Sequence, residues 1–142
     1  MGNKIQGEEM TSADFKYLVA SKRLYDARED KSIGIRLTEI ANAVKVSKAS
    51  VFRAIDRLEK SGYIRKNDRN KIVITEYGFA QLAEYRIMIE WLCSHLQYHC
   101  NISEEIARVD AINAACAMSD ESRHGLAEFI KSGTADRRKD ER

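Results

Sequence analysis

Apolar residues recur at helical spacing over most of the chain. Between about residues 11 and 28 they fall three or four positions apart, which places them on one face of a first helix. Thr11 or Ser12 stands before this run, where an N-cap belongs. The apolar face consists of Phe15, Leu18, Val19 and Leu24.

Two shorter helices follow the polar stretch 28–34. Residues 37–44 carry one apolar stripe, and residues 48–60 carry a second stripe. The break between them, Lys45 and Val46, is very short, and Ser47 stands at the N-cap position of the second helix. Two helices joined by such a brief turn predict a helix-turn-helix.

A small β-hairpin is predicted after Gly62. Residues 63–65 and 71–75 have the composition of strands, and the polar segment 66–70 between them has that of a turn. A hairpin directly after a helix-turn-helix is a wing. The predicted fold class is therefore mainly α, a winged helix-turn-helix domain over residues 11–76.

The remaining sequence predicts a helical dimerisation domain over residues 77–132. A long helix from about Thr75 to Gln97 is followed by helices over residues 103–118 and 119–133. Residues 1–10 and 133–142 lack an apolar face and are expected to be flexible tails.

The composition is that of an ordinary globular protein, with 44% hydrophobic and 32% charged residues. The sequence has neither an apolar run of roughly 18 residues nor an apolar N-terminal segment for secretion, so a cytoplasmic protein without a membrane span is expected. An odd number of cysteines, three, favours free thiols over a disulfide framework.

Basic residues concentrate in the predicted winged domain. Residues 36–75 contain ten lysines and arginines against four acidic residues, a net charge of +6, whereas the rest of the chain sums to −4. A cationic segment joined to an acidic body is typical of proteins that bind the phosphates of nucleic acid.

The second helix of a helix-turn-helix presents its N-terminal turns to the major groove. We expect Arg53 to bind a guanine edge, Ser50 to bond a base or phosphate, and Ala49 or Phe52 to meet a thymine methyl group. The candidate DNA-binding residues of this helix are Ser47, Lys48, Ala49, Ser50, Phe52, Arg53 and Arg57.

The wing supplies further candidate residues. A strand pair with a cationic tip suits phosphates or a minor groove, so its side chains position the protein more than they specify a sequence. These candidates are Arg65, Lys66, Arg69 and Lys71. Double-stranded DNA is the expected partner.

Residues 36–78 and 102–130 resemble the diphtheria toxin repressor family, which includes the manganese transport regulators. The first segment is similar to that family's DNA-binding domain, and the second, which contains the run MSDE, to its dimerisation and metal-binding region. The resemblance implies a homodimeric, repressor-like regulator that holds two DNA-binding heads apart and responds to a divalent metal.

The family's metal ligands are missing from this sequence. The resemblance implies an acidic or Met ligand on the first helix, a His on the long helix, and three ligands on the next helix: a Cys or Glu, a Glu and a His. Side chains that coordinate Mn²⁺ or Fe²⁺ poorly stand there instead, so no metal cofactor is expected. The residues at these positions are Lys16 and Val19, Ile89 or Glu90, and Ile112, Ala115 and Cys116 or, in another register, Asp110, Asn113 and Ala114.

Alternative functions remain open at this point. Cysteine and histidine side chains near the end of the long helix suggest a zinc site or a thiol-based redox sensor, and a protein-interaction adaptor is a third possibility. No motif of an enzyme is present, so an enzyme is not expected. The residues of the zinc or redox alternative are Cys93, Cys100, Cys116, His95 and His99.

Overall fold

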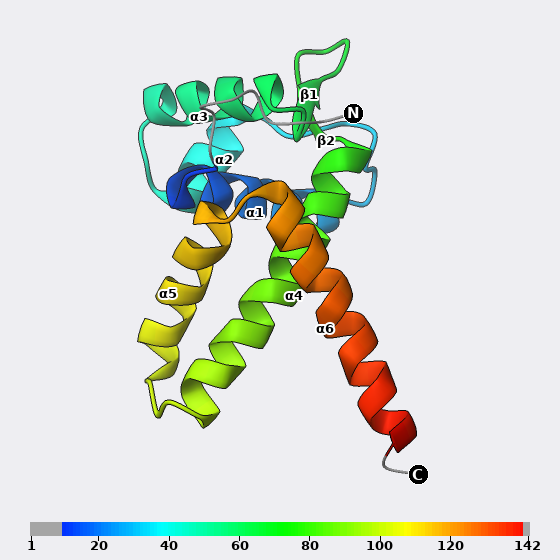
Figure 1. Ribbon diagram of the computed structural model, residues 1–142. Coiled ribbons are helices and arrows are strands. Elements are labelled where there is room, and N and C mark those ends of the chain that lie inside the picture. Colours follow the sequence, from blue (N-terminus) through cyan, green and yellow to red (C-terminus); the bar gives the residue numbers. More distant parts are fainter. Residues whose placement is uncertain (1–9, 141–142) are drawn as a thin grey trace. The chain divides into compact units, whose positions relative to one another are not determined.

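Six helices and two strands follow one another along residues 10–140, which the computed structural model describes. The predicted mainly helical, winged helix-turn-helix architecture is confirmed (Figure 1). Contacts divide the chain into two units, the first ending at Gln81 and the second beginning at Leu82. The elements are α1 (Ser12–Asp26), α2 (Leu37–Val44), α3 (Lys48–Lys60), β1 (Ile64–Lys66), β2 (Ile72–Ile74), α4 (Glu76–Tyr98), α5 (Glu104–Ala117) and α6 (Asp120–Asp140).

The first three helices share one apolar core. Helices α1, α2 and α3 contact one another, and their buried side chains belong mainly to the apolar stripes seen in the sequence. Leu18, Ile40 and Val51 are fully buried and represent the three helices. Because burial removes these apolar side chains from water, the core fixes how α3 is held against α1 and α2.

The wing is an antiparallel pair of short strands. Ile64 pairs with Ile74 and Lys66 with Ile72, so the buried isoleucines lie on one face of the pair. Ile35 adds a further bridge, since its backbone N–H and C=O each bond Ile72 at 2.8 Å. A single bridging residue has no alternating pattern, which is why the sequence did not predict it.

Helix α4 begins immediately after the wing. The Oγ1 of Thr75 accepts a hydrogen bond from the N–H of Gly78 at 2.9 Å and lies 2.6 Å from the carbonyl oxygen of Gly62, to which it donates. A Cβ at Gly78 would stand 2.1 Å from the carbonyl oxygen of Tyr63 and 2.9 Å from the Cγ2 of Ile74. Only glycine therefore allows α4 to start this close to β1.

Helices α4, α5 and α6 form the second unit. Alanines spaced four apart line the buried side of α5, and larger side chains of α4 are buried as well. Small side chains permit a short distance between helix axes. The buried residues of α4 and α5 in this unit are Leu82, Tyr85, Met88, Ile89, Cys93, Ala107, Ala111, Ala115 and Cys116.

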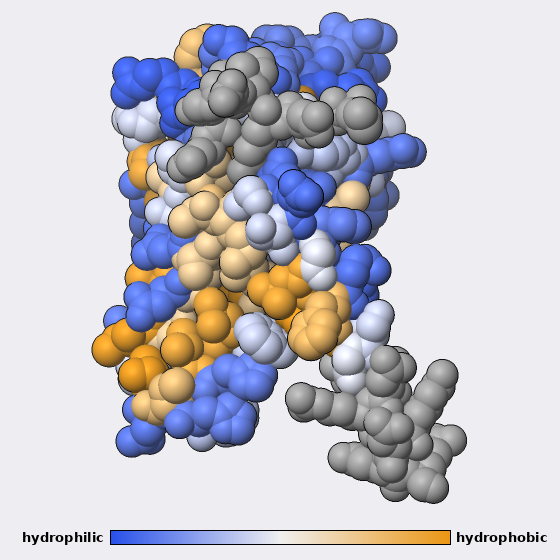
Figure 2. Space-filling view, in the orientation of Figure 1, coloured by the Kyte–Doolittle hydropathy of each residue, from blue (hydrophilic) through white to orange (hydrophobic). Residues whose placement is uncertain are grey.

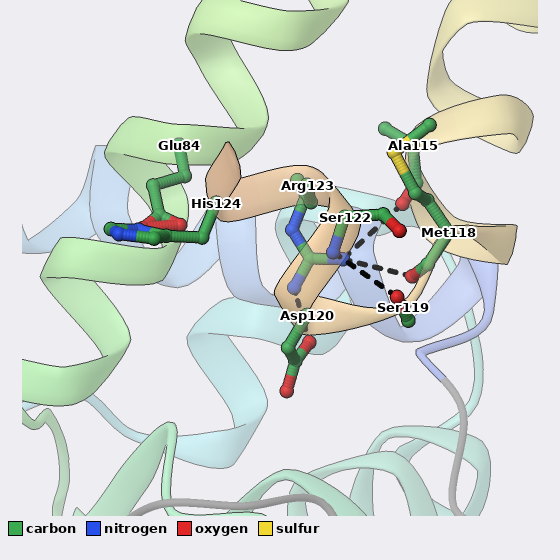
Figure 3. Close-up of polar contacts among 8 residues, drawn as sticks. All are labelled: Glu84, Ala115, Met118, Ser119, Asp120, Ser122, Arg123 and His124. Atoms are coloured by element: carbon green, nitrogen blue, oxygen red, sulfur yellow. Dashed lines mark hydrogen bonds and ion pairs between the residues drawn. The ribbon is translucent and has the colours of Figure 1, made fainter. Parts of the chain in front are cut away.

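A fully buried arginine closes the C-terminal end of α5. Nη1 of Arg123 donates to the carbonyl oxygens of Met118 at 3.1 Å and Ala115 at 3.4 Å (Figure 3). Its guanidinium also pairs with Asp120 and lies 3.9 Å from the ring centroid of Tyr85. Arg123 thus binds carbonyl groups that the end of α5 leaves without helical partners.

Two predicted helix ends differ from the structure. Helix α1 ends at Asp26 and not near Arg28, and α6 continues through Gly133 to Asp140. Residues 134–140 include Ala, Arg and Lys, good helix formers, and one interior glycine costs a helix only about 1 kcal/mol. The expected tail from residue 133 is thus helical as far as 140, while the expected flexibility of 1–9 and 141–142 concerns positions outside the described residues.

Candidate nucleic-acid interface

The turn of the helix-turn-helix is held by its backbone. Lys45 adopts φ 59°, the left-handed conformation that ends α2, and the N–H of Val46 donates to the carbonyl oxygen of Ala41 at 3.2 Å. The side chain of Ser47 then accepts from the N–H of Ser50 at 3.2 Å. The predicted N-cap is confirmed, and α3 starts at a defined point after α2.

Helix α3 has one buried and one exposed face. Its buried residues are those of the predicted stripe, Val51, Ala54, Ile55 and Leu58. The candidate residues on its opposite side are exposed, apart from the half-buried Ser50. The exposed candidates are Ser47, Lys48, Ala49, Phe52, Arg53 and Arg57.

Arg57 is held by an ion pair with α1. Its Nε and Nη2 donate to the two carboxylate oxygens of Asp14 at 2.9 and 2.8 Å. Asp14 is 3% exposed, and its hydrogen bond raises the pKa of the Arg57 guanidinium. A forked pair of this kind fixes both side chains. The sequence predicted that Arg57 contacts DNA. Its ion pair with Asp14 also attaches α3 to α1.

Arg53 has a different environment one turn earlier. It makes no ion pair within residues 10–133, whose side chains the structure describes, and its side chain belongs to the exposed face. Asp56 lies on the same side at helical spacing and pairs with Lys60 at 3.0 Å. Asp56 was not among the residues predicted from the sequence, although its i+3 spacing from Arg53 was the available signal.

The tip of the wing is organised by an asparagine. Oδ1 of Asn67 accepts from the N–H groups of Arg69 at 3.0 Å and Lys71 at 2.9 Å. Asn70 takes φ 60°, a left-handed conformation that asparagine tolerates. This side-chain turn exposes Arg69 at the tip. Asn67 was not among the residues predicted from the sequence, although asparagine in a polar turn was the available signal.

The cationic candidates of the wing differ in exposure. Arg65 and Arg69 are exposed, whereas Lys66 and Lys71 are half-buried. The ammonium of Lys66 lies 5.6 Å from the ring centroid of Phe52, so β1 contacts the outer face of α3. Figure 2 shows a mainly hydrophilic surface over α3 and the hairpin. The outer face of α3 and the wing therefore form one surface, rich in positive charge, within a single unit.

The structure does not bring together the cysteines and histidines of the zinc alternative. Among the side chains that the structure describes, those of residues 10–133, no group of three or more His, Cys, Asp or Glu is placed to hold a metal ion. The rings of His95 and His99 stack at 5.0 Å along α4. Cys93 and Cys116 are buried, and Cys100 is exposed. This geometry does not support a zinc site.

The side chains at the positions implied by the resemblance do not fit a Mn²⁺ or Fe²⁺ site either. Ala115 and Cys116 are buried in the core of the second unit, and Ile89 is buried on α4. Glu90 is a possible oxygen donor, but it pairs with Arg108 at 3.2 Å. Alkyl groups supply no ligand atom, and an adjacent guanidinium competes with a cation for the carboxylate.

Comparison with known proteins supports a regulatory, non-enzymatic role. Residues 30–71 match the MarR family. The matching segment covers α2, α3, β1 and the turn of the wing. It supports a winged-helix regulator, whereas the finer resemblance to the diphtheria toxin repressor family is not confirmed by this match. No curated protein matches the chain by sequence.

Solved structures share the fold over most of the chain. A hypothetical protein from Sulfolobus solfataricus aligns with a TM-score of 0.63 at 22% identity, covering 85% of this chain and 89% of that one. The manganese regulator SloR gives 0.61 at 16% identity, and IdeR of T. acidophilum gives 0.52 at 19%. The match covers 86% of this chain but 55% of each of those two chains.

No helix among the described residues is both long and apolar enough to cross a membrane.

Proposed function

We propose that this protein is a sequence-specific regulator of transcription that binds duplex DNA with α3 in the major groove. The observation that carries the proposal is the outer face of α3. It presents Lys48, Ala49 and Arg53 to solvent, while the opposite face is buried in the core. A major groove admits one α-helix, and an arginine bonds the O6 and N7 of guanine with two hydrogen bonds.

The wing binds the sugar-phosphate backbone beside the reading helix. Arg69 at the turn and Arg65 on β1 are exposed cations, and Asn67 fixes the turn that carries the first of them. Contacts to phosphates set orientation without reading bases. The match to the MarR family over residues 30–71 supports the same assignment.

The active form is a homodimer built on the second unit. Ile106 and Val109 on α5 and Phe129 on α6 are 57%, 55% and 66% exposed. Figure 2 shows apolar surface gathered over the part of the molecule where α4 and α5 lie. An exposed apolar surface favours association, and a two-fold pair of heads suits two half-sites one helical turn apart.

DNA binding proceeds without Mn²⁺ or Fe²⁺. In the first register, the side chains at the positions implied by the resemblance are the ammonium of Lys16, alkyl groups, the buried thiol of Cys116 and the ion-paired carboxylate of Glu90. The other register adds Asp110 and Asn113, which are exposed, and it too lacks the Glu and His that the resemblance implies. A metal strengthens DNA binding only through different affinities for the competent and incompetent states, and these residues offer it little to bind.

The proposal is tested by using the full chain to select DNA duplexes from a library of random sequences. We expect enrichment of a two-fold symmetric sequence. Arg53→Ala should weaken the free energy of binding to that sequence by about 1–3 kcal/mol. Arg69→Ala, at the exposed tip of the wing, should weaken all duplexes alike and lower the salt slope by about one unit. Absence of enrichment, or indifference to Arg53→Ala, would contradict the placement of α3.

The same duplex tests the metal claim. After treatment of the protein with EDTA, affinity is measured alone and with Mn²⁺ or Fe²⁺ added separately. We expect no change. A tightening of about tenfold, equivalent to about 1.4 kcal/mol, would overturn metal independence without affecting the assignment of DNA binding.

A further inference from the structure

An exposed phenyl ring lies in the middle of the cationic surface of the first unit. Phe52 on α3 is 56% exposed, and among the described residues of this unit only Ile33 is another large exposed apolar side chain. Its position on the second turn of α3 follows Ala49 by three residues, on the same side of the helix. The two side chains form an apolar strip on the face proposed to read DNA.

Charged groups surround this strip. Lys48 and Arg53 are exposed next to Ala49 and Phe52 in the sequence. The ammonium of Lys66 stands over the ring from β1 at 5.6 Å from its centroid. Such a rim suits a polyanion that also carries an apolar group, and suits an apolar protein surface much less.

The contact with Lys66 also restricts the ring. A cation over the face of a phenyl ring is attracted by the ring quadrupole, so the wing contributes to the position of a side chain on α3. One face of the ring is turned toward the ammonium. Its remaining exposed surface is available to a ligand in front of α3.

The major groove offers one apolar group on its base edges, the C5 methyl group of thymine. Cytosine carries hydrogen at that position, and purines present nitrogen and oxygen atoms there. We propose that Phe52 is a specificity-determining residue that reads a pyrimidine C5 methyl group in each half-site. This inference rests on the proposed function and adds a base preference to it.

Replacement of single thymines by deoxyuridine tests the inference, because it removes only the methyl group. In the duplex selected by the full chain, we expect one thymine per half-site at which this replacement weakens wild-type binding about fourfold, the effect of one buried methyl group. With Phe52→Ala, thymine and uracil at that position should bind equally. The affinities for the thymine and uracil duplexes are compared for the same protein variant. A mutation that weakens binding to both duplexes equally therefore leaves their ratio unchanged.

Ile33→Ala is the matched control, since it truncates the other exposed apolar side chain of this unit. It should retain the fourfold preference. At the same position, a 5-methylcytosine pair should bind the wild type more tightly than a cytosine pair, which separates recognition of the methyl group from recognition of thymine's oxygen.

The outcomes distinguish the two proposals. If the wild type selects a duplex and Arg53→Ala weakens binding to it, but no uracil substitution does, the methyl inference is wrong and the proposed function stands. Equal discrimination by the wild type and Phe52→Ala would also overturn the inference. A chain that selects no duplex would overturn both.

Discussion

Two arginines one turn apart on α3 have different surroundings. Arg57 donates two hydrogen bonds to the buried Asp14, whereas Arg53 makes no ion pair within residues 10–133. The same residue type on the same helix thus serves attachment of the helix in one case and, in our proposal, recognition of DNA in the other.

Stability measurements should separate these roles. We expect Arg57→Ala to lower the free energy of unfolding by about 1–2 kcal/mol, because it leaves the Asp14 carboxylate buried without its charged partner. Arg53→Ala, on the exposed face, should change it by less than about 0.5 kcal/mol. Urea denaturation measures both. Equal stability of the wild type and Arg57→Ala would show that the ion pair does not hold α3.

His124 gives the second unit a dependence on pH. Its Nδ1 lies 2.5 Å from Oε1 of Glu84, which joins α6 to α4 (Figure 3). The hydrogen bond to Glu84 raises the pKa of His124 above its ordinary value of 6.5, Glu128 acts in the same direction, and Lys131 opposes it. Because the folded state binds this proton more tightly, the contact stabilises the protein when His124 is charged.

The stabilisation is therefore complete below about pH 6.5 and is lost as the pH rises through the raised pKa. We expect the Tm to fall as the pH rises above about 6.5, and His124→Gln to reduce that fall. Thermal unfolding followed by circular dichroism at several pH values measures it. A His124→Gln profile parallel to that of the wild type would contradict the assignment.

At the scale of elements, the start of α4 depends on one glycine. A Cβ at Gly78 would overlap the carbonyl oxygen of Tyr63, while at Gly125 in α6 no atom lies within 4 Å. We expect Gly78→Ala to destabilise by about 1–3 kcal/mol or more through overpacking, and Gly125→Ala to stabilise by about 0.5–1 kcal/mol. Urea denaturation compares the pair. Similar effects at both positions would contradict the overlap between a Cβ at position 78 and the carbonyl oxygen of Tyr63.

Sequence patterns predicted the elements whose signals are local. The apolar stripe of α3 and its cap at Ser47 depend on residues within a few positions, and both are confirmed. The cap of α4 at Thr75 is likewise readable from the sequence and present in the structure.

Features formed by residues far apart in the chain could not be predicted in this way. The bond between Arg57 and Asp14 spans 43 positions, and the bridge of Ile35 to Ile72 joins a loop to a strand. Arg123 stands among polar residues in the sequence, which predicts an exposed side chain. It is nevertheless fully buried, because carbonyl groups at the end of α5 accept its hydrogen bonds. These residues become neighbours only when the chain folds, so local sequence patterns do not predict their contacts.

At the scale of the whole molecule, the proposed dimer places two winged heads on one duplex. We expect sedimentation of the wild type at micromolar concentration to give a dimer. Val109→Glu adds a charge to an exposed apolar position of α5, so it should produce a folded monomer. Glu105→Gln, also exposed on α5, is the control and should remain dimeric. A Val109→Glu dimer of unchanged affinity would place the interface elsewhere.

Sequence-specific binding of duplex DNA is the central claim, and one titration tests it most directly. The affinity of the full chain is measured by fluorescence anisotropy for the selected duplex and for a scrambled duplex of equal length and composition, at one fixed salt concentration near physiological. The account predicts a ratio of at least about a thousand in favour of the selected duplex. A ratio within a few-fold would mean that the basic surface binds phosphates without reading bases, and would contradict the account.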